Sequence, residues 1–234
     1  MGLPVLLFLL AAQRTLPPVP AAEVRRAEQP ILVDGKLDDA PWSRAQPLAL
    51  LFPWDRQTGA RQKTVVRLLW DDQYLYAAFD CEDTDITVQF DRRDDPTYRD
   101  DAVELFLNPK PSQNFYYGLE MNARAVLYDY FFAWPGLLLA RYDFTGVKLA
   151  THLRGTLNTS GDTDHGWSLE VAIPWRNFEE LGGAMPPRPG AEWSANLNRW
   201  DGTEPDRRLS LWSDSGQAEP DPHNPARFGK LVFK

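Results

Sequence analysis

The sequence has little cysteine and histidine, and this scarcity excludes several kinds of site. Its 234 residues include one cysteine, Cys81, so an intramolecular disulfide framework cannot form. Cys81 follows an apolar run, which is typical of an unreactive core thiol. The three histidines, His152, His165 and His223, are far apart and lack the spacing of metal ligands. We therefore expect neither a disulfide-stabilised scaffold nor a histidine metal centre.

Positive charge is also scarce. The chain has 25 lysines and arginines against 33 aspartates and glutamates, a formal net charge of −8. Its longest basic runs are pairs, such as Arg25-Arg26 and Arg207-Arg208. Binding to a nucleic-acid backbone needs a basic face, so we expect no nucleic-acid partner. A neutral ligand or a cation is the partner that this charge favours.

Long apolar runs are absent after the N-terminus. Residues 1–12 (MGLPVLLFLLAA) are too few to cross a bilayer as a helix but have the length of a signal-peptide core. Small residues at 19–22 (VPAA) would permit cleavage. We predict a signal peptide at residues 1–22 and a mature chain, 23–234, that is secreted to the periplasm or the extracellular space and has no membrane span. A wrongly assigned start codon and an uncleaved anchor are the alternatives.

The mature chain is rich in segments typical of β-strands. Runs of β-branched and aromatic residues alternate with turn residues, and the length suits one domain. The predicted strands are residues 31–33, 64–70, 74–81, 102–107, 115–122, 125–132, 146–153, 167–173, 192–200, 208–213 and 228–233. A helical turn is expected at 37–42 and a helix at 175–181. This pattern predicts an all-β fold, a two-sheet antiparallel β-sandwich of jelly-roll or immunoglobulin-like type with one or two short helices.

Aromatic residues are abundant, with nine tryptophans, eight tyrosines and twelve phenylalanines. Such a content fits wide two-layer packing or a surface that stacks on flat ligands. Trp42, Trp70, Trp167 and Trp175 lie in or beside apolar strands, so we expect them in the core. The predicted loops at 55–61, 90–101, 134–144, 182–190 and 214–225 are long, and long loops on a rigid sandwich often carry binding sites.

Five motifs occur in an order that resembles the carbohydrate-binding modules of family 9. They are VDGKLDDAPW at 33–42, LWDDQYLY at 69–76, DDAVELFL at 100–107, GWSLEVAIPW at 166–175 and NPARFGKL at 224–231. The resemblance covers residues 31–233. It implies a jelly-roll-like sandwich that binds carbohydrate without catalysis. Such modules are often attached to glycoside hydrolases or found in exported proteins of polysaccharide-degrading bacteria.

The resemblance also implies site residues. In the family, two tryptophans clamp the terminal sugar and polar groups hold its hydroxyls. Tyr98 occupies the position of the first clamp aromatic, and Glu104 and Asn122 match sugar-facing polar residues. Glu120 stands where the family has an arginine, which reverses the charge of that contact. Glu170 matches a strand glutamate that we expect at the base of the site.

The second clamp tryptophan is missing. Pro222 and His223 fill its position, and the nearest aromatic residue is Trp212. The clamp is therefore rebuilt with Trp212 or His223, or it is absent. Tyr98 has a structural alternative as a loop aromatic folded onto the sandwich edge, and Glu104 has one as a solvated strand residue.

The resemblance further implies calcium in structural loops. The acidic stretch containing Asp80, Glu82, Asp83 and Asp85 offers the oxygen ligands that Ca²⁺ prefers, although its spacing is not that of an EF-hand. Further acidic residues could join it, namely Asp91, Asp94, Asp95, Asp100 and Asp101. A solvated acidic edge is the alternative.

Three functions remain open at this point. The first is non-catalytic binding of an oligosaccharide or polysaccharide. The second is an orphan sandwich that binds a protein or another non-sugar ligand. The third is a glycoside hydrolase, which needs two carboxylates at a set distance in a deep cleft.

Overall fold

Most of the described chain forms β-strands. The computed structural model describes residues 15–140, 142–159 and 161–234. The described part contains thirteen strands: β1 (Ala21–Arg26), β2 (Leu48–Ala49), β3 (Thr64–Trp70), β4 (Tyr74–Cys81), β5 (Ala102–Asn108), β6 (Phe115–Asn122), β7 (Leu127–Ala133), β8 (Leu137–Ala140), β9 (Lys148–Leu153), β10 (Trp167–Pro174), β11 (Glu192–Asp201), β12 (Arg208–Leu211) and β13 (Gly229–Phe233). The mostly-β prediction is confirmed.

Helical segments are short. Four 3-10 helices span Ala40–Arg44, Thr97–Arg99, Trp175–Phe178 and Pro225–Arg227 in the described residues, and α1 spans Glu179–Gly182. The helix predicted at 175–181 is thus a 3-10 turn that continues into α1. Pro174 precedes it in extended conformation, which ends β10 and starts the helical turn.

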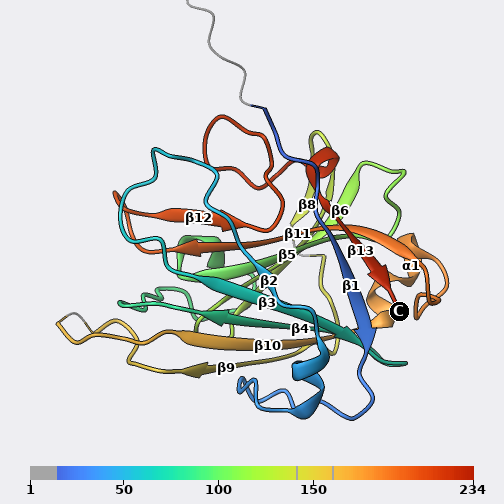
Figure 1. Ribbon diagram of the computed structural model, residues 1–234, viewed down its shortest axis with the longest axis horizontal. Coiled ribbons are helices and arrows are strands. Elements are labelled where there is room, and N and C mark those ends of the chain that lie inside the picture. Colours follow the sequence, from blue (N-terminus) through green and yellow to red (C-terminus); the bar gives the residue numbers. More distant parts are fainter. Residues whose placement is uncertain (1–14, 141, 160) are drawn as a thin grey trace, which may run out of the picture.

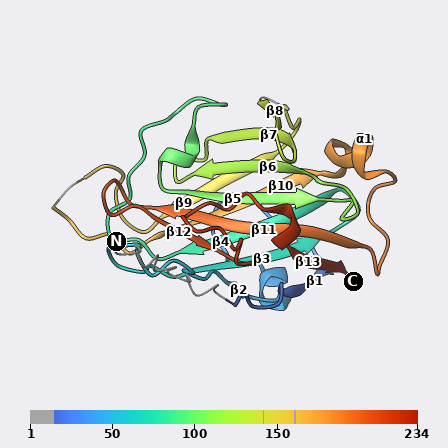
Figure 2. The ribbon, with the colours of Figure 1, turned by 90° about the horizontal axis from the view of Figure 1, so that it is seen from above.

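The strands form one curled mixed sheet. Eleven of the described strands follow the order β8-β7-β6-β5-β11-β13-β1-β3-β4-β10-β9, while β12 pairs with β11 and β2 with β3. β1 pairs with β13 through Ala21–Val24 and with β3 through Arg25 and Arg26. It therefore joins a first half, β5–β8 with β11–β13, to a second half, β2–β4 with β9 and β10 (Figures 1 and 2).

The strand directions correct part of the prediction. Both pairings of β1 are parallel, whereas the other strand pairings in the described chain are antiparallel. The predicted purely antiparallel arrangement is wrong at β1, because residues 21–26 were not expected to form a strand.

The core lies between the two halves. Val103, Leu105 and Leu107 of β5 are fully buried and belong to the same apolar cluster as Phe79 and Leu169 of the second half. Side chains alternate across a strand, so Glu104 and Phe106 point to the opposite face of β5. This outer face of the first half is where the pocket described below lies.

The expected core aromatics and the thiol are buried. Trp42, Trp70, Trp167 and Trp175 are between 0% and 4% exposed, which confirms the prediction. Cys81 is buried as well, and desolvation raises the pKa of its thiol to about 12. The thiol is therefore protonated and inert at neutral pH.

Two predicted segments differ from the structure. Residues 31–33 form no strand, and Ala21–Arg26 forms β1 instead, with Ala22 and Val24 buried and charged residues between and after them. The predicted loop at 134–144 contains β8, an edge strand whose four residues are exposed. Because both faces of β8 are exposed, its sequence lacks the alternation of apolar and polar residues that identifies a strand.

The N-terminal prediction falls mostly outside the described residues, which begin at residue 15. The proposed cleavage region at 19–22 overlaps the start of β1, where Ala22 is 4% exposed. Among the described helices, none is long and apolar enough to cross a membrane.

Candidate functional site

Four side chains form a row across the outer face of the first half. Asn198 lies opposite Glu104, Glu104 opposite Glu120, and Glu120 opposite Tyr128 in the strand register. Directly opposed residues have Cβ atoms roughly 4.5–5.5 Å apart. The register therefore sets the two carboxyl groups side by side.

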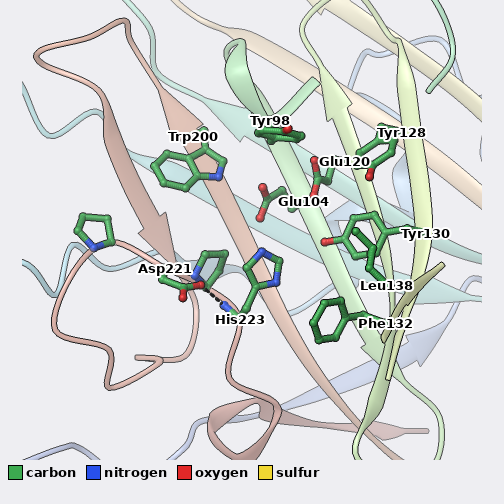
Figure 3. A pocket seen from close by; sticks show the side chains of 12 residues that line it. Tyr98, Glu104, Glu120, Tyr128, Tyr130, Phe132, Leu138, Trp200, Asp221 and His223 are labelled. Carbon is green, nitrogen blue, oxygen red and sulfur yellow. Dashed lines mark hydrogen bonds between the residues drawn. The ribbon is translucent and has the colours of Figure 1, made fainter. Parts of the chain in front are cut away.

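Three residues of this row, Glu104, Glu120 and Tyr128, line a pocket of about 350 Å³, a size within the range of roughly 300–1,000 Å³ typical of small-molecule sites. Glu104 and Glu120 form its floor and are 1% and 4% exposed (Figure 3). The other lining residues are Tyr98, Tyr128, Tyr130, Phe132, Leu138, Trp200, Pro220, Asp221, Pro222 and His223. Three of the strands β5–β8 thus supply aromatic or acidic side chains to one cavity.

One wall of the pocket consists of aromatic residues of β7. Tyr128, Tyr130 and Phe132 are every second residue of this strand, so they share one face. Gly118 of β6 lies directly beneath Tyr130: a Cβ atom there would be 2.2 Å from Cζ of the tyrosine ring. The lack of a side chain at Gly118 allows the ring to lie over β6.

The opposite side of the pocket carries Trp200. In Figure 3 this residue of β11 and the β7 tyrosines lie on opposite sides of Glu104. The Arg207 guanidinium carbon is 4.3 Å from the Trp200 ring centroid. Arg207 Nη2 also donates hydrogen bonds to the carbonyl oxygens of Tyr98 and Asp100. Arg207 therefore connects Trp200 to the loop that carries Tyr98.

Tyr98 remains accessible at the pocket. Its side chain lies in the Thr97–Arg99 turn, is 37% exposed, and has its ring centroid 6.1 Å from that of Tyr128. The predicted first aromatic contact is thus available to a ligand.

His223 lines the pocket from the loop before the Pro225–Arg227 turn. Its ring stacks on Phe106 with centroids 5.0 Å apart, and Nδ1 is 2.6 Å from the Tyr116 hydroxyl. Burial lowers the pKa of His223, and the charge of Asp221 opposes this shift. The imidazole is therefore neutral at neutral pH, with one face covered by Phe106.

The paired carboxyls have perturbed acidities. Burial raises the pKa of Glu104 to about 7, against the opposing effects of Asn198, Arg207 and Trp200. Asn198 Nδ2 donates to Glu104 Oε2 at 3.1 Å. Burial, reinforced by the charge of Glu104, raises the pKa of Glu120 well above its ordinary value. The floor can therefore both donate and accept hydrogen bonds near neutral pH.

Asn122 lies outside the pocket. It is fully buried, and its Nδ2 donates to Phe90 O at 2.9 Å and to Asp100 Oδ2 at 2.8 Å. Its Oδ1 accepts the backbone N–H of Val126 at 3.0 Å. Asn122 therefore has a positioning role instead of the predicted contact with a sugar. Its hydrogen bonds close the β6–β7 turn and anchor the segment that carries Tyr98.

Glu170 also lies away from the pocket, on β10 in the second half. Its Oε2 accepts backbone N–H groups of Asp34 and Gly35 at 3.0 and 2.9 Å, and Oε1 accepts Trp42 Nε1 at 2.7 Å. The expectation that Glu170 lies at the base of the site is thus not supported. Its carboxyl instead fastens the segment at 33–42 to the sheet.

Trp212 cannot rebuild the clamp. It is 6% exposed, belongs to the core cluster, and lies against Gly229, where a Cβ atom would be 2.4 Å from Cζ3 of the indole. The pocket is instead lined by Trp200, Tyr128 and Tyr130, which were not among the predicted site residues. Their signal was the period-two placement of aromatic residues on predicted strands, opposite the apolar face.

The four acidic residues predicted at 80–85 do not converge. Asp80 pairs with Arg154 at 2.9 Å, and Glu82 accepts a backbone N–H at 3.2 Å. The backbone N–H of Asp85 donates to Asp83 Oδ1 at 3.1 Å. Of these four residues only Asp83 enters a group of carboxylates in the described chain.

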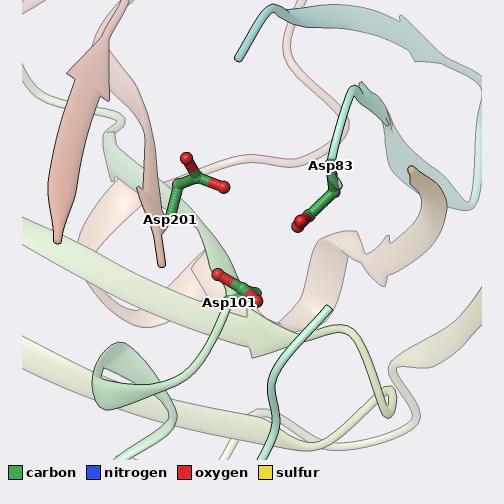
Figure 4. A group of neighbouring side chains, drawn as sticks. All are labelled: Asp83, Asp101 and Asp201. Atoms are coloured by element: carbon green, nitrogen blue, oxygen red, sulfur yellow. The ribbon is translucent and has the colours of Figure 1, made fainter. Parts of the chain in front are cut away.

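That group consists of Asp83, Asp101 and Asp201, with ligand atoms within 4.8 Å of one another (Figure 4). Arg199 Nη2 donates to Asp83 at 2.8 Å and to Asp201 at 2.6 Å, and Arg208 also pairs with Asp201. Because two guanidinium groups supply the positive charge, these residues do not fit a calcium ion, which needs six to eight oxygen ligands.

The curled sheet and its aromatic-walled pocket define a mostly-β ligand-binding domain. A sequence model of the family described as "Carbohydrate family 9 binding domain-like" matches residues 33–234. The chain belongs to this family.

Individual relatives agree with the family assignment. The chain is 27% identical over 154 residues to "Endo-1,4-beta-xylanase A" of Thermoanaerobacterium saccharolyticum, which is 66% of this chain but 12% of that protein. A putative carbohydrate-binding protein from Bacteroides uniformis has a similar structure, with a TM-score of 0.76, 16% identity, and coverage of 92% of this chain and 100% of that one. A carbohydrate-binding module of family 9 from Caldicellulosiruptor kristjanssonii, in complex with cellotriose, aligns with a TM-score of 0.60, 16% identity, and coverage of 92% and 93%. At this identity the structural similarities concern the fold.

Proposed function

We propose that this chain is a non-catalytic carbohydrate-binding module whose pocket holds the end of an oligosaccharide or polysaccharide. The observation that carries the proposal is the combination of aromatic walls, Trp200 and the β7 tyrosines, with a floor of paired carboxyls. The C–H face of a pyranose packs on aromatic rings, and its hydroxyls need fixed polar partners. Family membership supports the same ligand class.

Different pocket residues would contact different parts of a sugar. Trp200 and Tyr128 offer ring faces, and Tyr98 adds an accessible ring between them. Glu104 and Glu120 offer oxygen atoms for hydroxyl groups. β-1,4-linked glucans and xylans are the first ligands to examine, given the bound cellotriose of one structural neighbour and the name of the xylanase relative.

The carboxyl arrangement favours binding over hydrolysis. A glycosidase places its two carboxyl groups on opposite sides of the scissile bond. Glu104 and Glu120 are instead neighbours on one floor, on adjacent strands. Among the described residues that line the pocket, Asp221 is the one further carboxyl, and it lies at the rim.

The wider setting is part of the proposal. We infer that the curled sheet acts as the predicted two-sheet sandwich, with the first half carrying the site and the second half supporting it. Residues 1–22 direct export, so the module acts outside the cytoplasm in polysaccharide catabolism. The apolar run at 1–12 and the name of the xylanase relative support this setting. Calcium has no role in the proposal, because arginines occupy the carboxylate group.

Calorimetric titration with cello-, xylo-, manno- and galacto-oligosaccharides tests the proposal. We expect at least one series to bind, and Trp200→Ala to weaken binding about tenfold, because removing a stacking face costs about 1.4 kcal/mol or more. Tyr74→Ala serves as the matched control, because this partly buried ring lies on β4 in the second half. Flat heats across all four series at millimolar ligand would overturn the proposal.

A further inference from the structure

The pocket floor holds two buried carboxyls that form no ion pair with a basic side chain of the described residues. Glu104 and Glu120 are directly opposed in the register and almost fully buried. Glu120 Oε2 and the neighbouring Tyr130 hydroxyl are buried and form no hydrogen bond of ordinary geometry with the described residues, although the two groups are close enough to influence each other's pKa. A buried carboxyl oxygen without a well-formed hydrogen bond is costly, so a donor supplied by a ligand in this pocket would be favourable.

The nearby basic groups are committed elsewhere. Arg207 stacks on Trp200, and its Nη2 donates to two backbone carbonyls. It influences both carboxyls through space, but within the described chain no lysine, arginine or histidine nitrogen lies within the 4.0 Å ion-pair distance of either one. His223 is neutral and contacts Tyr116, while Asp221 adds a further negative charge.

The walls suit a cation as well as a sugar ring. Trp200 and the tyrosines of β7 present π faces beside the carboxyls, and such faces attract ammonium groups. A metal ion fits poorly, because two carboxyls are few ligands for calcium. A protonated amine fits better, because its three N–H donors can reach both carboxyls at once.

We infer that the pocket selects a sugar with a free, protonated amino group, an unacetylated glucosamine-type residue, whose ammonium group lies between Glu104 and Glu120. This inference rests on the proposed function. Stacking on Trp200 and Tyr128 holds the ring, and the ammonium group supplies a positive partner for the two carboxyls.

The acidity of the floor gives the inference a pH dependence. In the free protein, burial raises the pKa of Glu104 to about 7 and that of Glu120 well above its ordinary value, so a bound ammonium group must shift both carboxyls toward their ionised forms. Lowering the pH therefore protonates the floor and weakens binding of the amine. Asn198 of β11, Tyr130 of β7 and Arg207 face the same carboxyls but do not titrate between pH 5 and 7.5. Asp221 and His223 also line the pocket; Asp221 adds negative charge, and the lowered pKa of His223 means that any proton it gains at low pH would further oppose binding of the amine.

The experiment compares three β-1,4-linked disaccharides by calorimetry at pH 7.5: the dimer of glucosamine, the dimer of N-acetylglucosamine, and cellobiose. We expect the amine to bind at least tenfold more tightly than either neutral sugar, and this preference to fall at pH 5.5. Glu120→Gln should reduce the preference at least fivefold. Glu192→Gln should keep it, because Glu192 is a half-exposed residue of β11 that pairs with Lys230.

Two results overturn the inference, and they are distinguishable. If cellobiose binds as tightly as the amine, the selection for a cation is wrong while the proposed function stands. If none of the sugars binds, the proposed function fails as well. The comparison in the unaltered protein decides both outcomes even if Glu120→Gln does not fold.

Discussion

At the residue scale, two strand glutamates in similar sequence contexts have different roles. Glu104 and Glu170 each lie between apolar neighbours on a buried strand, and the alternation is the same. Their surroundings separate them. Glu170 accepts three hydrogen bonds from the segment at 33–42, whereas Glu104 accepts one from Asn198 and faces a cavity. Position on a strand could be predicted, but the partner on another segment could not.

Glu170→Ala should therefore destabilise the fold without weakening sugar binding. Three donors lose their acceptor, and we expect the free energy of unfolding to fall by about 2–4 kcal/mol. Chemical denaturation measures this loss, and Glu192→Ala, on an exposed strand site, should change stability by less than about 0.5 kcal/mol. Normal stability with lost sugar affinity would instead place Glu170 in the binding site.

At the scale of elements, strand periodicity predicted most of the sheet. β3–β7 and β9–β13 were predicted within two residues at each end, because buried and outward residues alternate or the strand is apolar throughout. β1 was missed because its apolar residues are few. The register was beyond reach, since pairing between distant segments depends on the whole sheet. For this reason Trp200 was not recognised as part of the pocket.

Gly118→Ala tests whether β6 and β7 together shape the pocket. The new methyl group would collide with the Tyr130 ring, which must then shift toward the cavity. We expect a loss of about 1–3 kcal/mol in stability and an approximately tenfold loss in sugar affinity. Gly136→Ala is the matched control, because a Cβ atom there meets no atom within 4 Å. Unchanged sugar affinity in Gly118→Ala would contradict the assignment of Tyr130 to the wall.

At the scale of the whole molecule, the acidic composition is partly internal. Glu104 and Glu120 lie in the pocket, while Asp83, Asp101 and Asp201 form a cluster held by arginines. The sequence shows the abundance of acidic residues, but the two roles that it suggested were a calcium loop and a solvated edge. Arg199, fully buried between these aspartates, comes from a distant strand and could not be connected to them in advance.

The buried acids predict an unusual dependence of stability on pH. Burial raises the pKa of Glu104 and of Asp101 to about 7, and that of Asp129 to about 6. The folded state therefore binds more protons than the unfolded chain between about pH 4 and 7, so stability decreases as the pH rises through this range. The lowered pKa values of His223, Glu23 and Asp34 act in the opposite direction, but the two partly exposed carboxyls do so only at the acidic end of this range.

Scanning calorimetry should accordingly give a higher melting temperature at pH 5.5 than at pH 8. Glu120→Gln should make this difference in melting temperature smaller. The substitution removes a buried carboxyl that keeps its proton in the folded protein and loses it in the unfolded chain. A melting temperature that rises from pH 5.5 to pH 8 would be inconsistent with the burial of these carboxyls.

The position of a bound sugar tests the central claim most directly. A crystal structure with the oligosaccharide that binds most tightly should show its terminal ring between Trp200 and Tyr128, with polar groups within hydrogen-bond distance of Glu104 and Glu120. A sugar bound at another surface, with this pocket unoccupied by the ligand, would contradict the claim.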